Sequence, residues 1–325
     1  MSETIAFSRR VVLCGLSTLA AGSALAATGW PDRQLTLTVG FPAGGPTDVV
    51  GRILAQALSL RLGQSVIVEN RPGAAGTTAG AYIARAQPDG YGLMLMTSSY
   101  AASAALFRTL PYRPIDDFSF ISTVIEFPYV LVTYADHPVH TMAELVAATR
   151  AHGPLTFGTS GVGSNQHLAM EQFVRLADIR MQHVPFRGGA PAITELLGKR
   201  LDFVIDQPSA LVDLVRDKQF RAIAITGAER FFSLPDTPTF AETGYPGFAV
   251  SGWQGLVAPP NLPADLTTRL HTDIVSIVGS TAISDQLKRL GNAPKTSTPE
   301  AFRSRLQTEI AMWTKVVDDA NIERI

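Results

Sequence analysis

Short apolar runs separated by amphipathic stretches recur along most of the chain. Runs with the length and composition of strands occupy 35–39, 65–69, 92–97, 129–134, 154–158, 181–186, 201–206 and 220–226. Between most of them, apolar residues recur at helical spacing, as Val50, Ile53, Leu54 and Leu58 do after the first run. Strands that alternate with helices predict βαβ units, and therefore mainly parallel sheets covered by helices on both faces.

The pattern changes in the last quarter of the chain. Pro259, Pro260 and Pro263 interrupt it, and mainly helical spacing follows. The stretch 299–321 predicts a closing helix whose apolar stripe consists of Phe302, Leu306, Ile310, Trp313 and Val317. We interpret this stripe as a surface that packs on the face of a domain.

Two loops that contain glycine each follow a strand-like run and precede a helical one. The first loop covers 41–48 and the second covers 158–167. A loop of this kind leaves backbone amides at a helix N-terminus, where the helix dipole favours an anion. Two α/β lobes, each with one such loop, would place the loops on opposite sides of a cleft.

The first loop does not have the motif of a nucleotide site. It has neither the spacing and lysine of G-x-x-x-x-G-K-[ST] nor the glycines of G-x-G-x-x-G. Pro46 suits the first turn of a helix, and Gly44 and Gly45 let the backbone approach a ligand closely. Asp48 leaves an alternative open, because its carboxylate can cap the same helix without any ligand.

The second loop carries hydroxyl and amide groups that can donate hydrogen bonds to a carboxylate. A hydrolase would need G-x-S-x-G around Ser160, but Val162 stands in place of the last glycine. The chain order Ser160, His183, Asp206 also differs from the Ser, Asp, His order of α/β-hydrolases. We therefore favour binding, and an exported α/β hydrolase remains the alternative.

Two further segments place polar residues at the ends of strands. Arg187 can pair with a carboxylate through two hydrogen bonds, or it can be a solvated arginine at a turn. Asp206 and Gln207 end one strand, and 97–100 ends another. Side chains in such places often face ligands in parallel sheets.

The N-terminus has the form of a signal peptide. Arg9 and Arg10 precede an apolar segment, 11–21, and Ala26 ends a small-residue cleavage motif. We predict a twin-arginine-like signal peptide over residues 1–26, cleavage near Ala26 and export to the periplasm. The apolar segment is shorter than the ~20 residues that span a bilayer.

Composition narrows the classes of function. The chain is 46% hydrophobic and 17% charged, which is ordinary for a globular protein. A net charge of −1 gives no reason to expect nucleic acid as a partner. The histidines are dispersed and H-E-x-x-H is absent, so the sequence predicts neither a metal site nor a cofactor.

Several longer blocks follow one another in a specific order along the chain. They are FPAGGPTD, VIVENRPGAAGT, QPDGYGLMLMTSS, LPYRPIDDF, FGTSGVGSNQHLA, VPFRGGAPAITELLGKRLDFVID, LPDTPTFAETGYPGF and SGWQGLVAP. In this order they resemble the substrate-binding proteins of tripartite tricarboxylate transporters, also called the Bug family. The resemblance covers essentially all of the chain after the signal peptide.

The resemblance implies a two-lobed, type II-like periplasmic binding protein of the α/β class that closes on a small carboxylate. Lobe 1 would comprise 27–125 and 250–325, and lobe 2 would comprise 126–249, with crossing strands near 120–134 and 248–258. Such a protein is a monomer without enzymatic activity. It would deliver its ligand to a membrane permease of one large and one small subunit, or act as a ligand sensor for a membrane kinase.

The resemblance also implies a set of ligand-binding residues. They are Phe41, Ala43, Gly44, Gly45, Thr47, Asp48, Gly76, Thr77, Thr78, Ser98, Ser99, Tyr100, Ser160, Gly161, Ser164, Asn165, His167, Arg187, Gly188 and Asp206. Pro46, Phe186 and Gln207 depart from the residues that are common in the family. The ligand therefore stays open among aliphatic and aromatic dicarboxylates, tricarboxylates, amino acids and nicotinate-like compounds.

Overall fold

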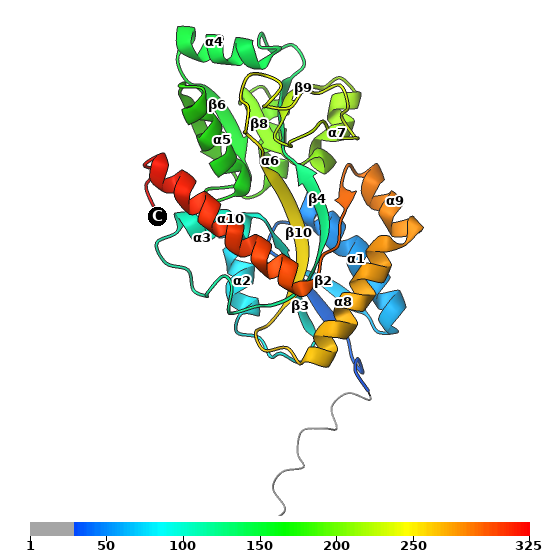
Figure 1. Ribbon diagram of the computed structural model, residues 1–325. Helices are drawn as coiled ribbons and strands as arrows, with labels where there is room; N and C mark the ends of the chain where they lie inside the picture. Colours follow the sequence, from blue (N-terminus) through cyan, green and yellow to red (C-terminus); the bar gives the residue numbers. More distant parts are fainter. Residues whose placement is uncertain (1–28) are drawn as a thin grey trace, which may run out of the picture.

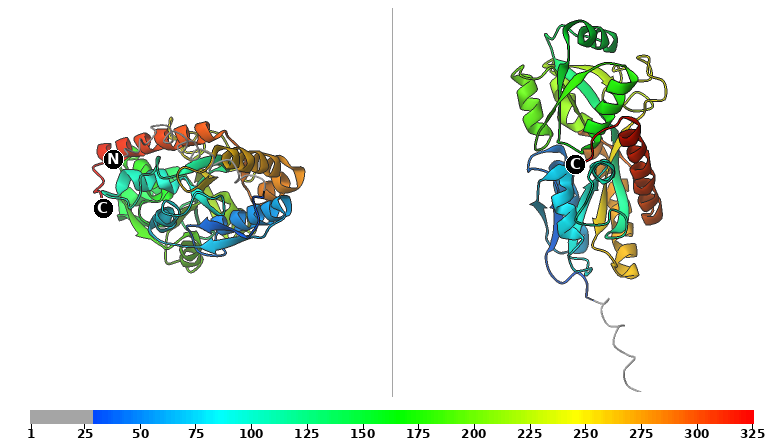
Figure 2. Two further views of the ribbon diagram at one scale, coloured as in Figure 1. Left: turned by 90° about the horizontal axis from the view of Figure 1, so that it is seen from below. Right: turned by 90° about the vertical axis from the view of Figure 1, so that its left-hand side faces the viewer.

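A computed structural model describes residues 29–325, and the predicted signal peptide lies outside them. The described chain forms two sheets flanked by helices, one above the other in Figure 1 and again distinct in the side view of Figure 2. The strands are β1 (Leu35–Val39), β2 (Val66–Asn70), β3 (Gly92–Thr97), β4 (Ser119–Pro128), β5 (Val130–Tyr134), β6 (Leu155–Thr159), β7 (Met181–Pro185), β8 (Phe203–Asp206), β9 (Phe220–Ile225), β10 (Ser251–Ala258) and β11 (Ala293–Pro294). The runs predicted from the apolar pattern match β1, β2, β3 and β5 to β9 closely.

Helices connect most of these strands. They are α1 (Pro46–Leu62), α2 (Thr77–Ile83), α3 (Ser99–Leu106), α4 (Met142–His152), α5 (Asn165–Leu176), α6 (Gly189–Leu197), α7 (Pro208–Arg216), α8 (Ala264–Gly279), α9 (Thr281–Arg289) and α10 (Pro299–Asp319), with a short 3₁₀ turn η1 (Ala74–Gly76) before α2. No helix of residues 29–325 has both the length and the apolar character that crossing a membrane requires.

Both sheets are mixed, whereas the sequence predicted mainly parallel ones. The first sheet has the order β11-β4-β10-β3-β1-β2 and the second has the order β7-β6-β8-β5-β9. The parallel prediction is correct within the βαβ units, where β1 pairs with β2 and β3, and β6 pairs with β7 and β8. It is wrong for β10 and β5, which pair antiparallel with their neighbours because the chain changes sheets at these strands.

The chain passes between the two sheets twice. Tyr129 alone separates β4 of the first sheet from β5 of the second, and the chain returns after β9 to form β10. Here lobe 1 denotes the part built on the first sheet, and lobe 2 the part built on the second. β4 and β10 lie side by side, with Ser251 opposite Pro128, so both passages occur at the same place (Figure 1).

The apolar pattern alone did not reveal β4 and β10. β4 is buried along nearly its whole length and so shows no alternation, and β10 contains Gly252 and Gly255. Gly255 is required by packing, because a Cβ there would come within 2.5 Å of the Phe302 ring of α10. These two neighbouring strands of lobe 1 therefore lack the usual signature of a strand.

The closing helix predicted over 299–321 is confirmed as α10. Thr298 caps it by accepting a hydrogen bond from the amide of Ala301. Phe302, Leu306, Trp313 and Val317 of the predicted apolar stripe are buried, and Ile310 is partly buried. The helix packs on β4 and also contacts α5 of lobe 2, so it joins the two lobes on one side of the molecule (Figure 1).

Candidate functional site

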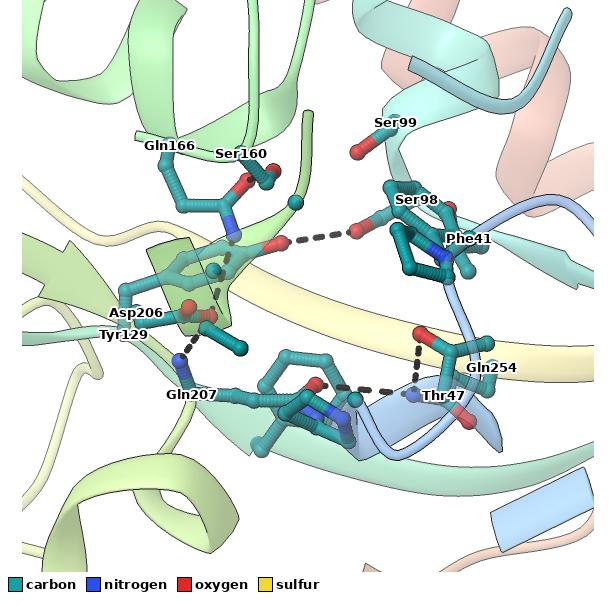
Figure 3. Close-up of a pocket in the computed structure, with 18 of the residues that line it drawn as sticks. Phe41, Thr47, Ser98, Ser99, Tyr129, Ser160, Gln166, Asp206, Gln207 and Gln254 are labelled. Atoms are coloured by element: carbon teal, nitrogen blue, oxygen red, sulfur yellow. Dashed lines mark hydrogen bonds between the residues drawn. The ribbon is translucent and has the colours of Figure 1, made fainter. Parts of the chain in front are cut away.

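A pocket lies between the lobes, beside the point where the chain crosses from one to the other. We call it the central pocket. It has an empty volume of about 570 Å³, counting its open mouth. Its lining residues are Phe41, Pro42, Ala43, Gly45, Pro46, Thr47, Thr97, Ser98, Ser99, Phe127, Tyr129, Ser160, Gln166, Gly188, Gly189, Ala190, Pro191, Asp206, Gln207 and Gln254, many of which Figure 3 shows.

Several helices begin at the wall of the central pocket. Thr47 lies in the first turn of α1, Ser99 in that of α3, Gln166 in that of α5 and Gly189 in that of α6, and Gln207 is the N-cap of α7. The first amides of a helix have no partner inside it, and the helix dipole makes this end positive. No lysine or arginine within residues 29–325 lines this pocket. Helix ends, rather than charged side chains, therefore supply the partial positive charge at this wall.

Asp48 holds the first loop from behind. Its carboxylate accepts hydrogen bonds from the Gly44 amide at 2.9 Å, from Arg52 Nε at 2.8 Å and from Asn70 Nδ2 at 2.9 Å. Burial raises the pKa of Asp48, but these hydrogen bonds outweigh it and lower the pKa below its usual value. Asp48 does not line the central pocket. The N-cap of α1 is Gly45, so no side chain at the N-cap accepts a hydrogen bond from the first turn. The first turn of α1 thus stays open toward the pocket.

Three polar atoms on the pocket wall are buried without a hydrogen-bond partner in the described chain. They are Thr97 Oγ1, Gln207 Nε2 and Gln254 Oε1. The bonds from Gln254 Nε2 to Thr47 Oγ1 and Gln207 Oε1 are long, at 3.4 Å each (Figure 3). Buried polar atoms in native proteins are nearly always paired. Unpaired atoms on three residues that line one pocket, from both lobes, therefore indicate a polar occupant.

Asp206 is the only carboxylate on the wall of this pocket among the described residues. It is 4% exposed, and its Oδ1 accepts hydrogen bonds from the Gln207 amide at 2.8 Å and from Gln166 Nε2 at 3.3 Å. Burial raises the pKa of Asp206 to about 6, against the opposing effect of these two bonds. A Cβ on Gly189 would come within 1.7 Å of Oδ2, so α6 can begin here only with glycine.

Ser160 does not have the contacts of a catalytic serine. Its hydroxyl donates to Gln166 Oε1 at 3.1 Å. His183, the histidine that a hydrolase would use, bonds through Nε2 to Thr159 Oγ1 at 2.7 Å. The partners of Asp206 are amides rather than an imidazole. The triad considered from the sequence is therefore not assembled.

A second hollow adjoins the central pocket, and we call it the side chamber. Its empty volume is about 1110 Å³, again counting its open mouth. It is lined by Gly40, Phe41, Pro42, Pro72, Gly73, Ala74, Ala75, Gly76, Phe107, Ser160, Gly161, Val162, Pro185, Phe186, Arg187 and Gly188. Phe41, Pro42, Ser160 and Gly188 line both hollows.

The structure brings many of the predicted ligand residues to these two hollows. Those on the central pocket are Phe41, Ala43, Gly45, Thr47, Ser98, Ser99, Ser160, Gly188 and Asp206. Gly76, Gly161 and Arg187 line the side chamber. Gly44, Asp48, Thr77, Thr78, Tyr100, Ser164, Asn165 and His167 line neither. For every residue of the predicted set, contact with a ligand stays a prediction.

Several of the predicted residues that lie off the walls support them. The Ser164 hydroxyl caps α5 by accepting from the His167 amide, and His167 Nδ1 accepts from the Gly163 amide at 3.4 Å. The Tyr100 hydroxyl donates to the Gly76 carbonyl beneath the side chamber. Asn165 Nδ2 contacts Ser98 Oγ at 3.3 Å, from lobe 2 to lobe 1.

Other lining residues were not in the set that the resemblance implied, although Thr97 and Gln207 were candidates from their places at strand ends. They are Pro42, Pro46, Thr97, Phe127, Tyr129, Gln166, Gly189, Ala190, Pro191, Gln207 and Gln254. Most are chain neighbours of predicted residues. Phe127, Tyr129 and Gln254 instead lie where the chain crosses between the lobes. The predicted crossings near 120–134 and 248–258 were the signal that could have identified them, because crossing strands form the floor of a cleft between lobes.

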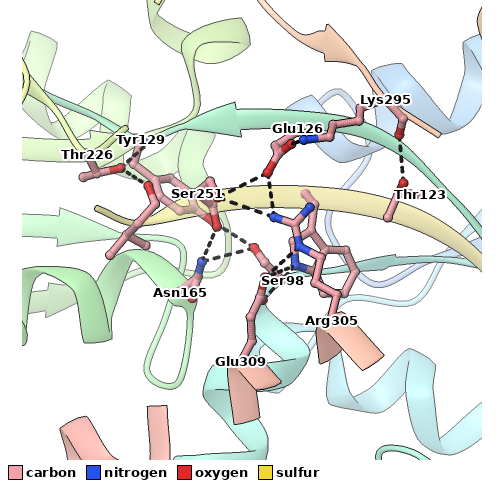
Figure 4. Close-up of polar contacts among 12 residues, drawn as sticks. Ser98, Thr123, Glu126, Tyr129, Asn165, Thr226, Ser251, Lys295, Arg305 and Glu309 are labelled. Atoms are coloured by element: carbon pink, nitrogen blue, oxygen red, sulfur yellow. Dashed lines mark hydrogen bonds and ion pairs between the residues drawn. The ribbon is translucent and has the colours of Figure 1, made fainter. Parts of the chain in front are cut away.

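A chain of polar contacts runs from the pocket to α10 (Figure 4). The Tyr129 and Ser98 hydroxyls lie 3.0 Å apart, and Asn165 Nδ2 reaches the Ser251 carbonyl at 3.4 Å. Ser251 Oγ lies 3.4 Å from both Glu126 and Arg305. Arg305 forms ion pairs with Glu126 and with Glu309, each at 2.8 Å. Lys295 also pairs with Glu126, at 2.6 Å. Glu309 accepts a hydrogen bond from the indole N–H of Trp253. These contacts connect both crossing strands to α10 and to the ligand loop of lobe 2.

Residues 29–325 contain no group of three or more histidine, cysteine or acidic side chains placed to hold a metal ion. What the central pocket offers is several helix N-termini, hydroxyls and amides around a space of small-molecule size. These groups donate hydrogen bonds to anionic oxygens.

Comparison with known proteins gives a consistent result. Residues 50–322 match the model of a family described as the tripartite tricarboxylate transporter family receptor. Protein BugT of Bordetella pertussis is 33% identical over 315 residues, which cover 95% of this chain and 97% of BugT.

Two solved structures are similar over their whole length. The structure of Rpa4515 from R. palustris with adipate has a TM-score of 0.87 and 33% identity, and the match covers 91% of this chain and 100% of that one. MatC (Rpa3494) from Rhodopseudomonas palustris with bound malate has a TM-score of 0.84 and 32% identity, over 89% of this chain and 100% of that one.

Proposed function

The chain belongs to the tripartite tricarboxylate transporter receptor family, also called the Bug family, and from this premise we propose that it captures a small carboxylate in the central pocket and delivers it to a membrane permease. Its fold is that of a two-lobed periplasmic binding protein, and the family and fold are those of substrate-binding receptors. Export to the periplasm and a permease of one large and one small subunit are parts of the proposal.

The convergence of helix N-termini on the central pocket is the observation that carries this proposal. α1, α3, α5, α6 and α7 begin at its wall, and the described residues place no lysine or arginine there. An anion held only by amides and hydroxyls is bound without a fixed countercharge, which suits a ligand that must later be released. The adipate and malate found in two similar structures support a small carboxylate as the ligand.

Closure of the cleft would complete the site. Ser98 and Ser99 of lobe 1 face Ser160 and Gln166 of lobe 2 across the pocket (Figure 3). The Asn165 amide of lobe 2 donates to Ser99 Oγ of lobe 1 at 3.3 Å. Hydrogen bonds to a charged ligand strengthen when water is excluded, so a bound carboxylate would stabilise this closed arrangement.

Thermal unfolding in the presence of a panel of carboxylates tests the proposal. A ligand at a hundredfold its dissociation constant adds about 2.7 kcal/mol to the free energy of unfolding, which raises the melting temperature by a few degrees. The primary amide of each acid is the matched control and should cause no shift. Equal shifts in melting temperature with an acid and its amide would refute carboxylate capture. The absence of measurable binding of every acid in titration calorimetry would refute it as well.

Delivery to a permease needs a test in cells. Deleting the gene should abolish uptake of the ligand that the panel identifies, and a plasmid copy should restore it. Unchanged uptake together with a lost transcriptional response to the ligand would instead assign the protein to sensing.

A further inference from the structure

The side chamber differs in chemistry from the central pocket. Its walls are mostly apolar, with Phe41, Phe107, Val162 and Phe186 around it. Arg187 also lines it and is the only cation on the wall of either hollow in the part of the chain that the structure describes. The chamber thus combines an apolar wall with one positive charge.

The phenyl groups of the side chamber come from separate parts of the fold. Phe41 follows β1, Phe107 follows α3 and Phe186 follows β7. Each is only partly buried, although the chain has a large core in which phenylalanine is commonly enclosed. Partly exposed rings that line one hollow lose water when an apolar group enters, and each Å² removed from water contributes about 25 cal/mol. The chamber therefore favours an apolar occupant.

Arg187 stands exposed in the loop between β7 and α6. No described residue with a carboxylate lines the side chamber, so nothing on its walls offsets this charge. A guanidinium binds a carboxylate through two parallel hydrogen bonds. The complementary occupant near Arg187 is an anionic group.

The two hollows meet where Gly188 of lobe 2 approaches Pro42 of lobe 1. A Cβ on Gly188 would lie 3.2 Å from Cδ of Pro42, and Gly188 has a φ of +113°, which favours glycine. Phe41, Pro42, Ser160 and Gly188 line both spaces. The absence of a side chain at position 188 leaves room between the lobes at this junction.

We propose that the ligand is an elongated dicarboxylate with an apolar spacer that occupies both hollows. One carboxylate lies among the helix N-termini of the central pocket, the spacer passes Phe41 and Gly188 into the side chamber, and the second carboxylate pairs with Arg187. This inference rests on the proposed capture of a carboxylate, and it adds the ligand class.

Titration calorimetry with straight-chain dicarboxylates from succinate to sebacate tests the proposal. The longer acids should bind more tightly than succinate, and suberate should bind about tenfold or more tightly than octanoate, its monocarboxylate of equal length. An analogue of suberate with ether oxygens in its spacer should bind more weakly than suberate, because its spacer is less apolar.

Arg187→Gln provides the specific variant, and Arg180→Gln is its matched control. Arg180 is an exposed arginine just before β7 that lines neither hollow. Arg187→Gln should remove the preference for suberate over octanoate and leave succinate binding unchanged, and Arg180→Gln should change neither. Circular dichroism and thermal unfolding verify that both variants are folded.

The outcomes separate this inference from the proposed function. If succinate binds as tightly as suberate, or if Arg187→Gln weakens both acids equally, the elongated ligand is wrong and carboxylate capture stands. If no carboxylate of any length binds, the proposed function fails, and this inference fails with it.

Discussion

Asp206 is a carboxylate on the wall of a pocket that we propose for carboxylates. Burial raises its pKa to about 6, and its recorded partners are the Gln207 amide and Gln166 Nε2. Among the described residues, no cation lines the pocket to offset its negative charge. A bound anion therefore favours the protonated form of Asp206, which links ligand binding to proton uptake.

This link predicts a pH-dependent affinity. Below pH 6, Asp206 is already protonated and binding needs no further proton. Above pH 6 the free protein is ionised at Asp206, so the dissociation constant should rise with pH, by up to about tenfold per unit. Titration calorimetry in buffers of different ionisation enthalpy measures both the affinity and the proton uptake.

Asp206→Asn is the variant that isolates this effect. It keeps an oxygen that accepts from the Gln207 amide and removes the titration. Its affinity for carboxylates should be flat across the same pH range and should exceed that of the parent protein above pH 6. A parent protein whose affinity is equally flat would exclude Asp206 as the coupled group.

At the scale of elements, α10 carries the polar contacts that fix the crossing strands. Arg305 is 24% exposed at its side chain and pairs with Glu126 of β4 and with Glu309. Burial raises the pKa of Glu309 even though Arg305 lies beside it. The pKa of Glu126 is lowered below its usual value, because the effect of Lys295 and Arg305 exceeds the opposing effect of burial. Arg305 thus lies against two partly buried carboxylates and favours the charged form of both.

Arg305→Gln should therefore cost about 1–3 kcal/mol in the free energy of unfolding, because it leaves Glu309 without its charged donor and Glu126 with Lys295 alone. Lys315→Gln on the same helix is the control. Lys315 is 76% exposed and, within residues 29–325, pairs only with Asp319, so this change should stay within about 0.5 kcal/mol. Urea unfolding of both variants measures the difference, and equal losses would show that α10 carries no special polar role.

Much of the secondary structure could be predicted from the sequence. The runs at 35–39 and 92–97 coincide with β1 and β3, because each is a clean apolar segment that ends at a loop. β4 and β10 could not be predicted from periodicity, because residues buried on both faces do not alternate and Gly252 and Gly255 weaken the strand pattern. Their location came from the family resemblance instead.

The candidate site could likewise be predicted in its loops but not in its crossing strands. Loop residues such as Thr47 and Ser160 were identified because helix starts after strands are recognisable from sequence. Gln254 was missed, since a polar residue within a strand gives no sign of which partner it will lack, and Tyr129 was missed because it begins an apolar run, 129–134. The role of Asp48 could not be decided until its contacts with Gly44, Arg52 and Asn70 were known.

At the scale of the whole molecule, the lobes touch where a glycine of lobe 2 meets a phenyl ring of lobe 1. Gly163 of lobe 2 packs against Phe107 of lobe 1, and Ser103 Oγ donates to the Gly163 carbonyl at 3.1 Å. A Cβ on Gly163 would come within 2.8 Å of the Phe107 ring, and its φ is +77°. The observed approach of the lobes therefore depends on glycine at this position.

Gly163→Ala should hold the lobes apart without unfolding either of them. We expect the ligand to bind about tenfold more weakly, because part of its binding free energy must restore the close approach. Gly279→Ala is the control, since nothing lies within 4 Å of a Cβ at that helix end. Small-angle scattering with saturating ligand should give a larger radius of gyration for Gly163→Ala alone, and identical radii for both variants would contradict this mechanism.

The position of β10 has a consequence for how the chain folds. β10 lies between β3 and β4 in the sheet of lobe 1, although it follows the whole of lobe 2 in the chain. The strands of lobe 2, β5 to β9, follow one another along the chain, so the sheet of lobe 2 can form without the last third of the protein. Lobe 1 must instead close a long loop before its central strand is in place, and such closure slows folding. Pulsed hydrogen exchange during refolding should therefore protect β6 and β8 before β3 and β10, which makes the inserted lobe the early-folding unit of the protein.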